Sequence, residues 1–153
     1  MSMSLIGDIL PVSHVVLDLN VSSKKRLFEE TGQLLSEEAG LSQEDVFNCL
    51  FAREKLGSTA LGKGVAIPHG RTGAVKDTVG AFFRLQTPIA FDAPDEQPVS
   101  LVFILLVPEN ASTKHLNVLS ELAGKFSQKS VRNALLSATS AESVREILIA
   151  EQV

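Results

Sequence analysis

The sequence has little of what marks secreted or membrane-spanning proteins. Its one cysteine, Cys49, excludes an internal disulfide or a metal site of several thiolates, and is expected to be a small packing residue. The longest apolar run covers only residues 101–107, whereas about 20 residues are needed to cross a bilayer. The N-terminus has no basic residue before its short apolar patch, so a secretory signal is not predicted. From these absences we expect a cytoplasmic protein without direct membrane insertion.

Nucleic acid is not expected as a main partner either. The net charge is −4, no block rich in lysine or arginine is present, and tryptophan and tyrosine are missing. Phosphate contacts and base stacking would need such residues. With 44% apolar residues in a chain of 153, the composition is that of a globular domain. We expect a single domain over residues 1–153, with a loosely ordered lead-in over residues 1–13, or at least 1–7.

Hydrophobic spacing predicts two helices in the first third of the chain and two or three in the last third. The first should end near Glu38, the second near Lys55, and a short helix should cover 130–137. The expected N-terminal caps are hydroxyl side chains: Ser22 or Ser23, Ser42, Ser112 or Thr113, and Ser140. The long third helix should turn these residues inward: Leu116, Leu119, Leu122, Ala123 and Phe126.

Four segments have the composition of β-strands. They are residues 15–17, 65–67, 79–85 and 99–107. Pro68 should end the second of them, and the last is apolar throughout, as a strand covered on both faces would be. The predicted order is β-α-α-β-β-β-α-α, with an optional further helix. This order favours an α/β layered domain.

The segment 57–64, GSTALGKG, comes close to a nucleotide-binding phosphate loop. Gly64 stands where that loop requires serine or threonine. The loop also has to follow a strand and precede a helix, because the helix N-terminus holds the phosphates. Here a helix precedes the segment and a short strand follows it. We therefore interpret it as a glycine-rich connection that binds no nucleotide.

The three histidines differ in their surroundings. His14 lies in the lead-in and is expected to be structural or solvent-facing. His115 falls in the first turn of the third helix, where a surface role is the simple alternative to a functional one. His69 stands between Pro68 and Gly70, so its imidazole should be accessible at the end of a strand, where functional loops gather. A turn histidine without a role is the alternative there.

An accessible His69 is compatible with few kinds of chemistry. A metal site would need more ligands, and only His115 offers a second nitrogen. A serine-type triad would need a positioned nucleophile, and no strained elbow is visible. A covalent phosphoryl acceptor needs only one neutral imidazole nitrogen, in-line access and cations to hold the charge. The cations that flank His69 in sequence are Arg53, Lys55, Lys63 and Arg71.

The block REKLGSTALGKGVAIPHGR, residues 53–71, resembles the active-site block of fructose/mannitol-type IIA domains. These domains belong to the bacterial phosphoenolpyruvate-dependent phosphotransferase system, and the block is most similar to their nitrogen-regulatory branch. The similarity continues through TPIAFDAPDEQPV (87–99) and LVFILLVPE (101–109) to His115. It thus covers roughly residues 8–150, and the block is long and unusual in composition.

This resemblance implies a fold and a set of site residues. The fold would be a three-layer α/β/α domain with a central mixed β-sheet. His69 would be phosphorylated on a ring nitrogen, Arg53 would stabilise the phosphoryl group, and His115 would hydrogen-bond His69 or that group. Glu54 is a weaker candidate, because a surface position at a helix end explains it equally well. No cofactor, nucleotide or metal ion is implied.

The resemblance also implies partners. The donor would be an HPr-like phosphocarrier protein of the nitrogen branch, and regulatory targets such as potassium transport or sensor proteins would be reached by protein contacts. The protein would then be a phosphotransferase component that acts mainly as a regulator. A sugar-specific IIA subunit that passes phosphate to a IIB partner remains an alternative. A non-catalytic interaction module of the same fold is a second alternative, and it would form no phosphohistidine.

Overall fold

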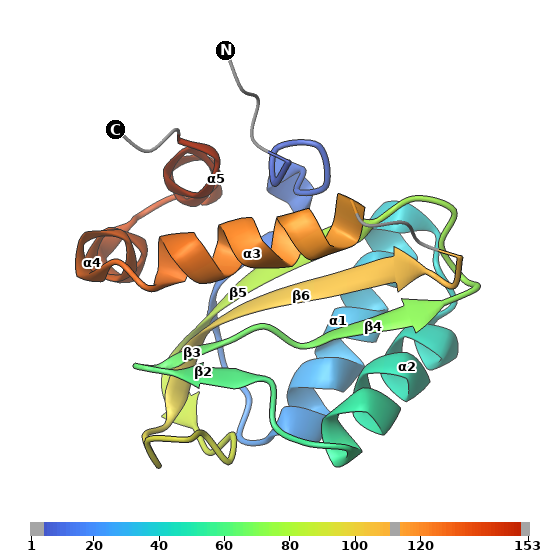
Figure 1. The fold of residues 1–153 in the computed structure, drawn as a ribbon, viewed down its shortest axis with the longest axis horizontal. Coiled ribbons are helices and arrows are strands. Elements are labelled where there is room, and N and C mark those ends of the chain that lie inside the picture. Colours follow the sequence, from blue (N-terminus) through green and yellow to red (C-terminus); the bar gives the residue numbers. More distant parts are fainter. Residues whose placement is uncertain (1–4, 111–113, 151–153) are drawn as a thin grey trace.

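A mixed β-sheet forms the middle of the molecule (Figure 1). The computed structural model describes residues 5–110 and 114–150, and within them the sheet has the strand order β1-β5-β6-β3-β2, with β4 also paired to β6. The strands are β1 (Val15–Leu19), β2 (Ala60–Gly62), β3 (Val65–Ala66), β4 (His69–Thr72), β5 (Val79–Ile89) and β6 (Val99–Pro108). Strand β6 runs antiparallel to β5 and parallel to β3 and β4. The expected mixed sheet is confirmed.

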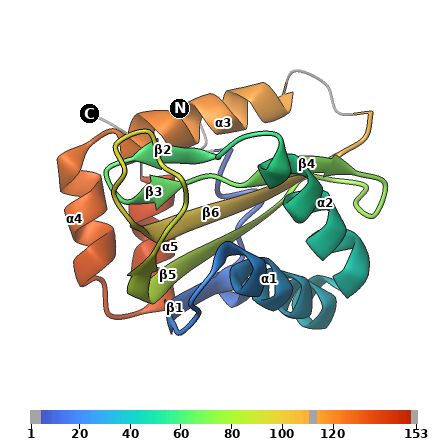
Figure 2. The ribbon, with the colours of Figure 1, turned by 90° about the horizontal axis from the view of Figure 1, so that it is seen from below.

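Helices cover both faces of this sheet, as Figures 1 and 2 show. The helices are α1 (Lys24–Ala39), α2 (Gln43–Lys55), α3 (Lys114–Phe126), α4 (Lys129–Ser137) and α5 (Ala141–Ile149), with a short 3₁₀ helix, η1 (Val12–His14), before β1. Helices α1 and α2 lie on one face, and α3, α4 and α5 lie on the other. The expected three-layer α/β/α arrangement is confirmed. None of the helices in the described part of the chain is long and apolar enough to span a membrane.

Strand β6 is buried because its two faces belong to two separate apolar cores. Val102, Ile104 and Leu106 pack into the core under α1 and α2. Phe103 and Leu105, on the opposite face, pack into the core under α3, α4 and α5. Side chains alternate between the faces of a strand, so a strand between two helical layers has to be apolar throughout. The uninterrupted run in the sequence has this physical cause.

Local capping explains where three of the helices begin. The hydroxyl of Ser23 accepts a hydrogen bond from the Arg26 amide at 3.1 Å, and Ser42 does the same for Asp45 at 3.2 Å. Ser140 caps α5 in the same way. These side chains satisfy amides that have no partner within the first turn of a helix. The prediction for these caps is confirmed, whereas Ser112 and Thr113 lie outside the described residues.

The predicted strand end at Pro68 is confirmed, because β3 ends at Ala66, but a further strand that was not predicted begins at His69. Strand β3 pairs with β6 through Ala66 and Val102, and β4 resumes the pairing through His69 and Leu105 with the same offset. The Pro68 carbonyl accepts a hydrogen bond from the Leu105 amide at 2.9 Å, which links the two segments. Proline lacks an N–H group, but it is tolerated along a sheet edge where no partner strand requires that donor. His69 therefore lies within an edge strand and not in a turn.

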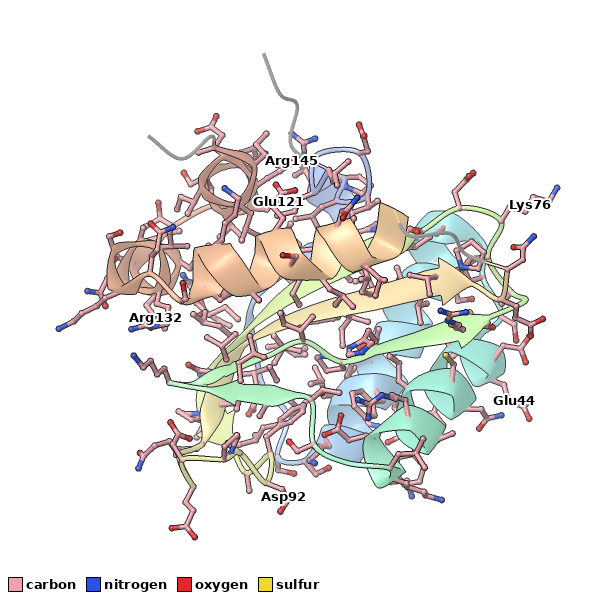
Figure 3. The ribbon with its side chains drawn as sticks, viewed as in Figure 1. Glu44, Lys76, Asp92, Glu121, Arg132 and Arg145 are labelled. Atoms are coloured by element: carbon pink, nitrogen blue, oxygen red, sulfur yellow. The ribbon has the colours of Figure 1, made fainter. Side chains whose placement is uncertain are left out.

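The N-terminal segment differs from the expected loose lead-in. Ile6 and Leu10 are fully buried and Ile9 is nearly so, all in the core under α3, α4 and α5. Arg145 of α5 (Figure 3) holds this segment by donating to the carbonyls of Leu10 at 2.7 Å and Gly7 at 3.0 Å. The expectation is therefore wrong for residues 5–13. Residues 1–4 lie outside the described part.

The inward face of α3 is partly different from the predicted one. Leu122 and Phe126 are buried as expected, and Leu119 is half-buried. Leu116, however, is 56% exposed, and Ala123 is exposed too, whereas Val118 is buried. Leu116 and Leu119 line a pocket together with residues of β4. Leu116 therefore faces a pocket at the sheet edge instead of the core.

Candidate functional site

His69 and Arg71 share one face of β4, because alternate residues of a strand point to the same side. They pair with Leu105 and Val107 of β6, which belong to the core under α3. A pocket of about 340 Å³ opens on this face. It is lined by three long polar side chains, by Gly70 and by an apolar wall. The polar side chains are Arg53, His69 and Arg71, and the apolar wall is formed by Leu105, Val107, Leu116 and Leu119. Among the described residues that line the pocket, none is acidic.

The ring of His69 is oriented by a backbone hydrogen bond. Its Nδ1 lies 2.7 Å from the carbonyl oxygen of Ile67, two residues earlier. A carbonyl oxygen only accepts, so Nδ1 must carry the proton in this bond. In the neutral ring the other nitrogen, Nε2, then has a free lone pair. The imidazole is half-buried, and its Nε2 can act as a nucleophile or a general base.

Arg53 reaches the pocket from α2, and a close contact between α2 and β4 explains how. Gly70 of β4 has no side chain, and the Cys49 sulfur occupies the adjoining space. Arg53 lies four residues after Cys49, which is about one helical turn, so both are on the same face of α2. The guanidinium Nη1 donates to the Gly57 carbonyl at 3.0 Å. The structure thus brings Arg53 and His69 to the same pocket.

Glu54, next to Arg53, is buried and does not lie on the surface at the helix end. Its carboxylate accepts from the Thr59 hydroxyl at 2.6 Å and from the Thr59 amide at 3.1 Å. Lys24 of α1 forms an ion pair with it at 3.0 Å and a second one at 3.1 Å with Asp92, which is labelled in Figure 3. These bonds fix the segment after α2. Glu54 therefore stabilises the segment beside the pocket and does not line the pocket itself.

The structure sorts the four candidate cations into two groups. Arg53 and Arg71 line the pocket. The Lys55 ammonium instead lies over the Phe51 ring, 4.6 Å from its centroid. Lys63 occupies the turn between β2 and β3, where its amide donates to Asp95 at 2.8 Å. The sequence could not make this distinction, although a strand assigned to 69–72 would have placed Arg71 beside His69.

The same turn confirms that residues 57–64 are no phosphate loop. Lys63 and Gly64 have positive φ values of 57° and 81°, which suit a tight hairpin turn. A helix precedes this segment and strands follow it, so no helix N-terminus is available to hold a phosphate there.

The remaining candidates have the following positions. His14 is buried, and its Nδ1 lies 2.9 Å from the Gly80 carbonyl oxygen, so it is structural and not solvent-facing. Cys49 packs against β4, as expected for a small packing residue, and burial raises the pKa of its thiol. His115 belongs to the first turn of α3, but its side chain lies outside the described part of the structure. Within the described residues, no group of three or more potential metal ligands is found.

The fold and the pocket together define a small α/β/α domain in which one histidine shares a pocket with two arginines. The chain belongs to the family described as phosphoenolpyruvate-dependent sugar phosphotransferase system, EIIA 2, whose model matches residues 8–151.

Individual relatives place the chain near the nitrogen-regulatory proteins of this family. A structure of nitrogen regulatory protein IIA-Ntr from Neisseria meningitidis is 68% identical, with a TM-score of 0.90, over 95% of this chain and 99% of that one. The nitrogen regulatory protein of Klebsiella oxytoca is 44% identical over 133 residues, or 85% of this chain and 81% of its own. A fructose-specific EIIA component from Haloferax volcanii is 33% identical over 144 residues, or 94% of each chain. The resemblance found in residues 53–71 is thereby confirmed.

Proposed function

We propose that this protein is a cytoplasmic phosphoryl carrier and regulator of the nitrogen branch, and that His69 carries the phosphoryl group. The observation that carries this proposal is the 2.7 Å contact between His69 Nδ1 and the Ile67 carbonyl. It leaves Nε2 as the free nitrogen of a ring that lines a pocket with two guanidinium groups. The membership of the EIIA family and the similarity to nitrogen regulatory proteins support it.

The transfer step requires little from the protein beyond positioning and charge. The lone pair of His69 Nε2 attacks the phosphorus of a phosphohistidine on the donor protein. A new P–N bond forms as the donor P–N bond breaks, and the electron pair of that bond returns to the donor ring. Arg53 stabilises the negative charge on the phosphoryl oxygens, because its planar guanidinium matches their geometry. The proton on Nδ1 stays in its bond to Ile67, so no additional base is required.

His115 is proposed as a second partner of the phosphoryl group. Leu116 and Leu119, on the same helix, line the pocket beside His69. A His115→Ala variant should therefore accept phosphate more slowly than the unchanged protein while it folds normally. An unchanged rate would remove His115 from the site.

The donor is proposed to be an HPr-like phosphocarrier of the nitrogen branch that docks on apolar side chains around the pocket. Leu56, Leu61 and Leu116 are exposed by 84%, 49% and 56%. They belong to the end of α2, to β2 and to α3, which border the pocket edge of the sheet (Figure 2). Exposed apolar residues grouped at one edge are typical of a protein-docking surface.

Regulation would follow from the change in charge. A phosphoryl group adds about −1.5 to −2 charges at neutral pH. Target proteins, such as potassium transport or sensor proteins, would bind one of the two charge states more tightly than the other.

The proposal is tested by incubating the protein with phosphoenolpyruvate and the two upstream phosphotransfer proteins. We expect one acid-labile phosphate by intact mass, located by peptide mapping within residues 65–71. His69→Ala should remain unlabelled, whereas the surface variant Lys55→Ala should be labelled like the unchanged protein. Phosphate on His69→Ala, or none on the unchanged protein, would refute the proposal. In the second case, unchanged partner binding by His69→Ala would indicate a non-catalytic interaction module.

A sugar-specific role remains a second candidate, because the Haloferax volcanii fructose-specific component covers nearly the whole chain. It would use the same residues and pass the phosphoryl group to a IIB partner. Incubating the labelled protein with a fructose-type IIB domain distinguishes the two roles. Rapid transfer to that domain would favour the sugar-specific role, and retention of phosphate on His69 would favour the regulatory one.

A further inference from the structure

Arg71 has a position in the pocket that the proposed reaction does not yet use. It follows His69 by two residues on β4, so both side chains leave the same face of the strand. Both line the pocket, together with Arg53. The two arginines come from different elements: Arg53 from α2 and Arg71 from the strand that carries the histidine.

The backbone of Arg71 is held firmly, although its side chain is exposed. It pairs with Val107 of β6 on one side. On the other side its carbonyl accepts a hydrogen bond from the Cys49 sulfur at 3.4 Å. The origin of the side chain is therefore fixed relative to His69.

The wall of the pocket makes a cation at this place effective. Leu105, Val107, Leu116 and Leu119 surround the polar groups with apolar side chains. Charge interactions beside such a wall are stronger than in open water, because the local dielectric constant is lower. A transferred phosphoryl group carries up to two negative charges, and one guanidinium neutralises only one of them. Arg53 and Arg71 both line the pocket, so two guanidinium groups together match the charge of that group.

We propose that Arg71 is a second phosphoryl-binding residue, which contacts the phosphoryl oxygens on His69 from β4 while Arg53 contacts them from α2. This inference rests on the proposed function and deepens it. Arg71 donates to the oxygens during transfer and remains bound to them afterwards. Lys55 and Lys63, which also flank His69 in sequence, have no such role, because neither lines the pocket.

Two phosphoryl donors distinguish whether Arg71 contacts the phosphoryl group or only the carrier protein. The first is the phosphorylated carrier. The second is phosphoramidate, a small donor that needs no docking surface: its P–N bond breaks, ammonia leaves, and a P–N bond forms to His69 Nε2. Labelling of His69 is followed by peptide mapping with both donors in Arg71→Ala, Arg71→Lys and the matched control Lys55→Ala.

We expect Arg71→Ala to be labelled at least about tenfold more slowly with both donors, the size expected for loss of a hydrogen bond to a charged group. Arg71→Lys should lie between it and the unchanged protein, because lysine keeps the charge but loses the planar fork. Lys55→Ala should stay within about twofold of the unchanged protein. Urea titrations of all three variants check that each is folded under the labelling conditions.

The outcomes distinguish this inference from the function on which it rests. If Arg71→Ala reacts normally with phosphoramidate, the inference is overturned, even where transfer from the carrier is slow, because Arg71 would then act only in docking. If the unchanged protein reacts with phosphoramidate but not with the carrier, the proposed function fails while Arg71 is still tested. If His69 reacts with neither donor, both are refuted.

Discussion

The sulfur of Cys49 fills the space that a side chain at Gly70 would need. A β-carbon built on Gly70 would lie 2.6 Å from Cys49 Sγ, whereas the next nearest atom, the Cys49 carbonyl oxygen, is 3.5 Å away. This contact lets α2 approach β4 closely. Arg53, one turn further along α2, thereby reaches the pocket of His69. The distance between a helix and a strand is thus set by one cysteine and one glycine.

A Gly70→Ala variant is expected to lose about 1–3 kcal/mol of unfolding free energy, the usual cost of overpacking a tight contact. Urea unfolding followed by circular dichroism measures this loss. Labelling of His69 by the phosphorylated carrier should slow as well, because α2 and Arg53 move away from β4.

The matched control removes the sulfur. In a Cys49→Ala background the added methyl group would meet no atom closer than ordinary contact distance, and Gly70 does not have a positive φ. Gly70→Ala should then cost little or even stabilise the protein, because alanine restricts the unfolded chain. Equal costs in the two backgrounds would show that the contact between Cys49 and Gly70 does not set the spacing.

Glu54 is expected to matter more for stability than its place at the end of a helix suggests. Its side chain is only 6% exposed, and it binds Lys24 and both donors of Thr59. Glu54→Ala leaves these groups without their acceptor and should lower the unfolding free energy by about 2–3 kcal/mol. This is less than the loss on breaking a fully buried ion pair, because Lys24 also binds Asp92. Glu54→Gln should cost less, since it keeps an acceptor for Thr59. Glu44→Ala, an exposed acid on the same helix, serves as the control and should change the unfolding free energy by under about 0.5 kcal/mol in a urea titration.

Much of the fold could be predicted from the sequence because it is encoded locally. The caps Ser23, Ser42 and Ser140 act on amides three residues away, so a short window contains the whole interaction. The strand that begins directly after Pro68 is not encoded locally. Whether a strand continues beyond a proline depends on the neighbouring strand, here β6, more than thirty residues later. Burial of Leu116 or Val118 on α3 likewise depends on where the helix crosses the sheet.

The candidate site was predictable to a similar degree. His69 is indicated by its flanking residues and by the resemblance of the whole block. The distinction between Arg71 and Lys63 needs the strand assignment that Pro68 obscured. The burial of Glu54 could not be read from the sequence at all, because Lys24 and Thr59 approach it from other elements.

The thiol of Cys49 should be a poor nucleophile in the folded protein. Burial raises the pKa of this thiol above its ordinary value, so less thiolate is present at a given pH than in the unfolded chain. Iodoacetamide should therefore react more slowly with the native protein than with the urea-unfolded protein at pH 8.5. Equal rates in the two states would contradict the burial of the thiol behind β4.

The same shift predicts the direction of a pH effect on stability. The raised pKa of the Cys49 thiol stabilises the folded state. This contribution is complete at pH values below the thiol pKa of the unfolded chain, about 8.5, and it is lost as the pH rises through the higher thiol pKa of the folded protein. The unfolding free energy of the unchanged protein should therefore decline over that alkaline range. Cys49→Ala should lack this part of the decline. A parallel decline in both proteins would assign the effect to other groups.

Arg84 is predicted to fasten the C-terminal end of α4 to the sheet. Its side chain on β5 is 11% exposed, and its Nη1 donates to the carbonyls of Leu135 at 3.0 Å and Ala138 at 2.5 Å. It also pairs with Asp18 of β1 at 3.2 Å. The last carbonyls of a helix have no partner within the helix, so this arginine supplies donors that water would otherwise provide.

Arg84→Ala should therefore cost about 2–4 kcal/mol of unfolding free energy, because it leaves these carbonyls unpaired and opens space under α4. Arg84→Lys should recover only part of this, since a single ammonium cannot serve both carbonyls and Asp18 in the fixed fork geometry of a guanidinium. Asp18→Ala, which removes only a 63% exposed partner, should cost no more than about 1 kcal/mol. Urea titrations of the three variants decide the matter: if Asp18→Ala costs as much as Arg84→Ala, the ion pair and not the helix end is what Arg84 stabilises.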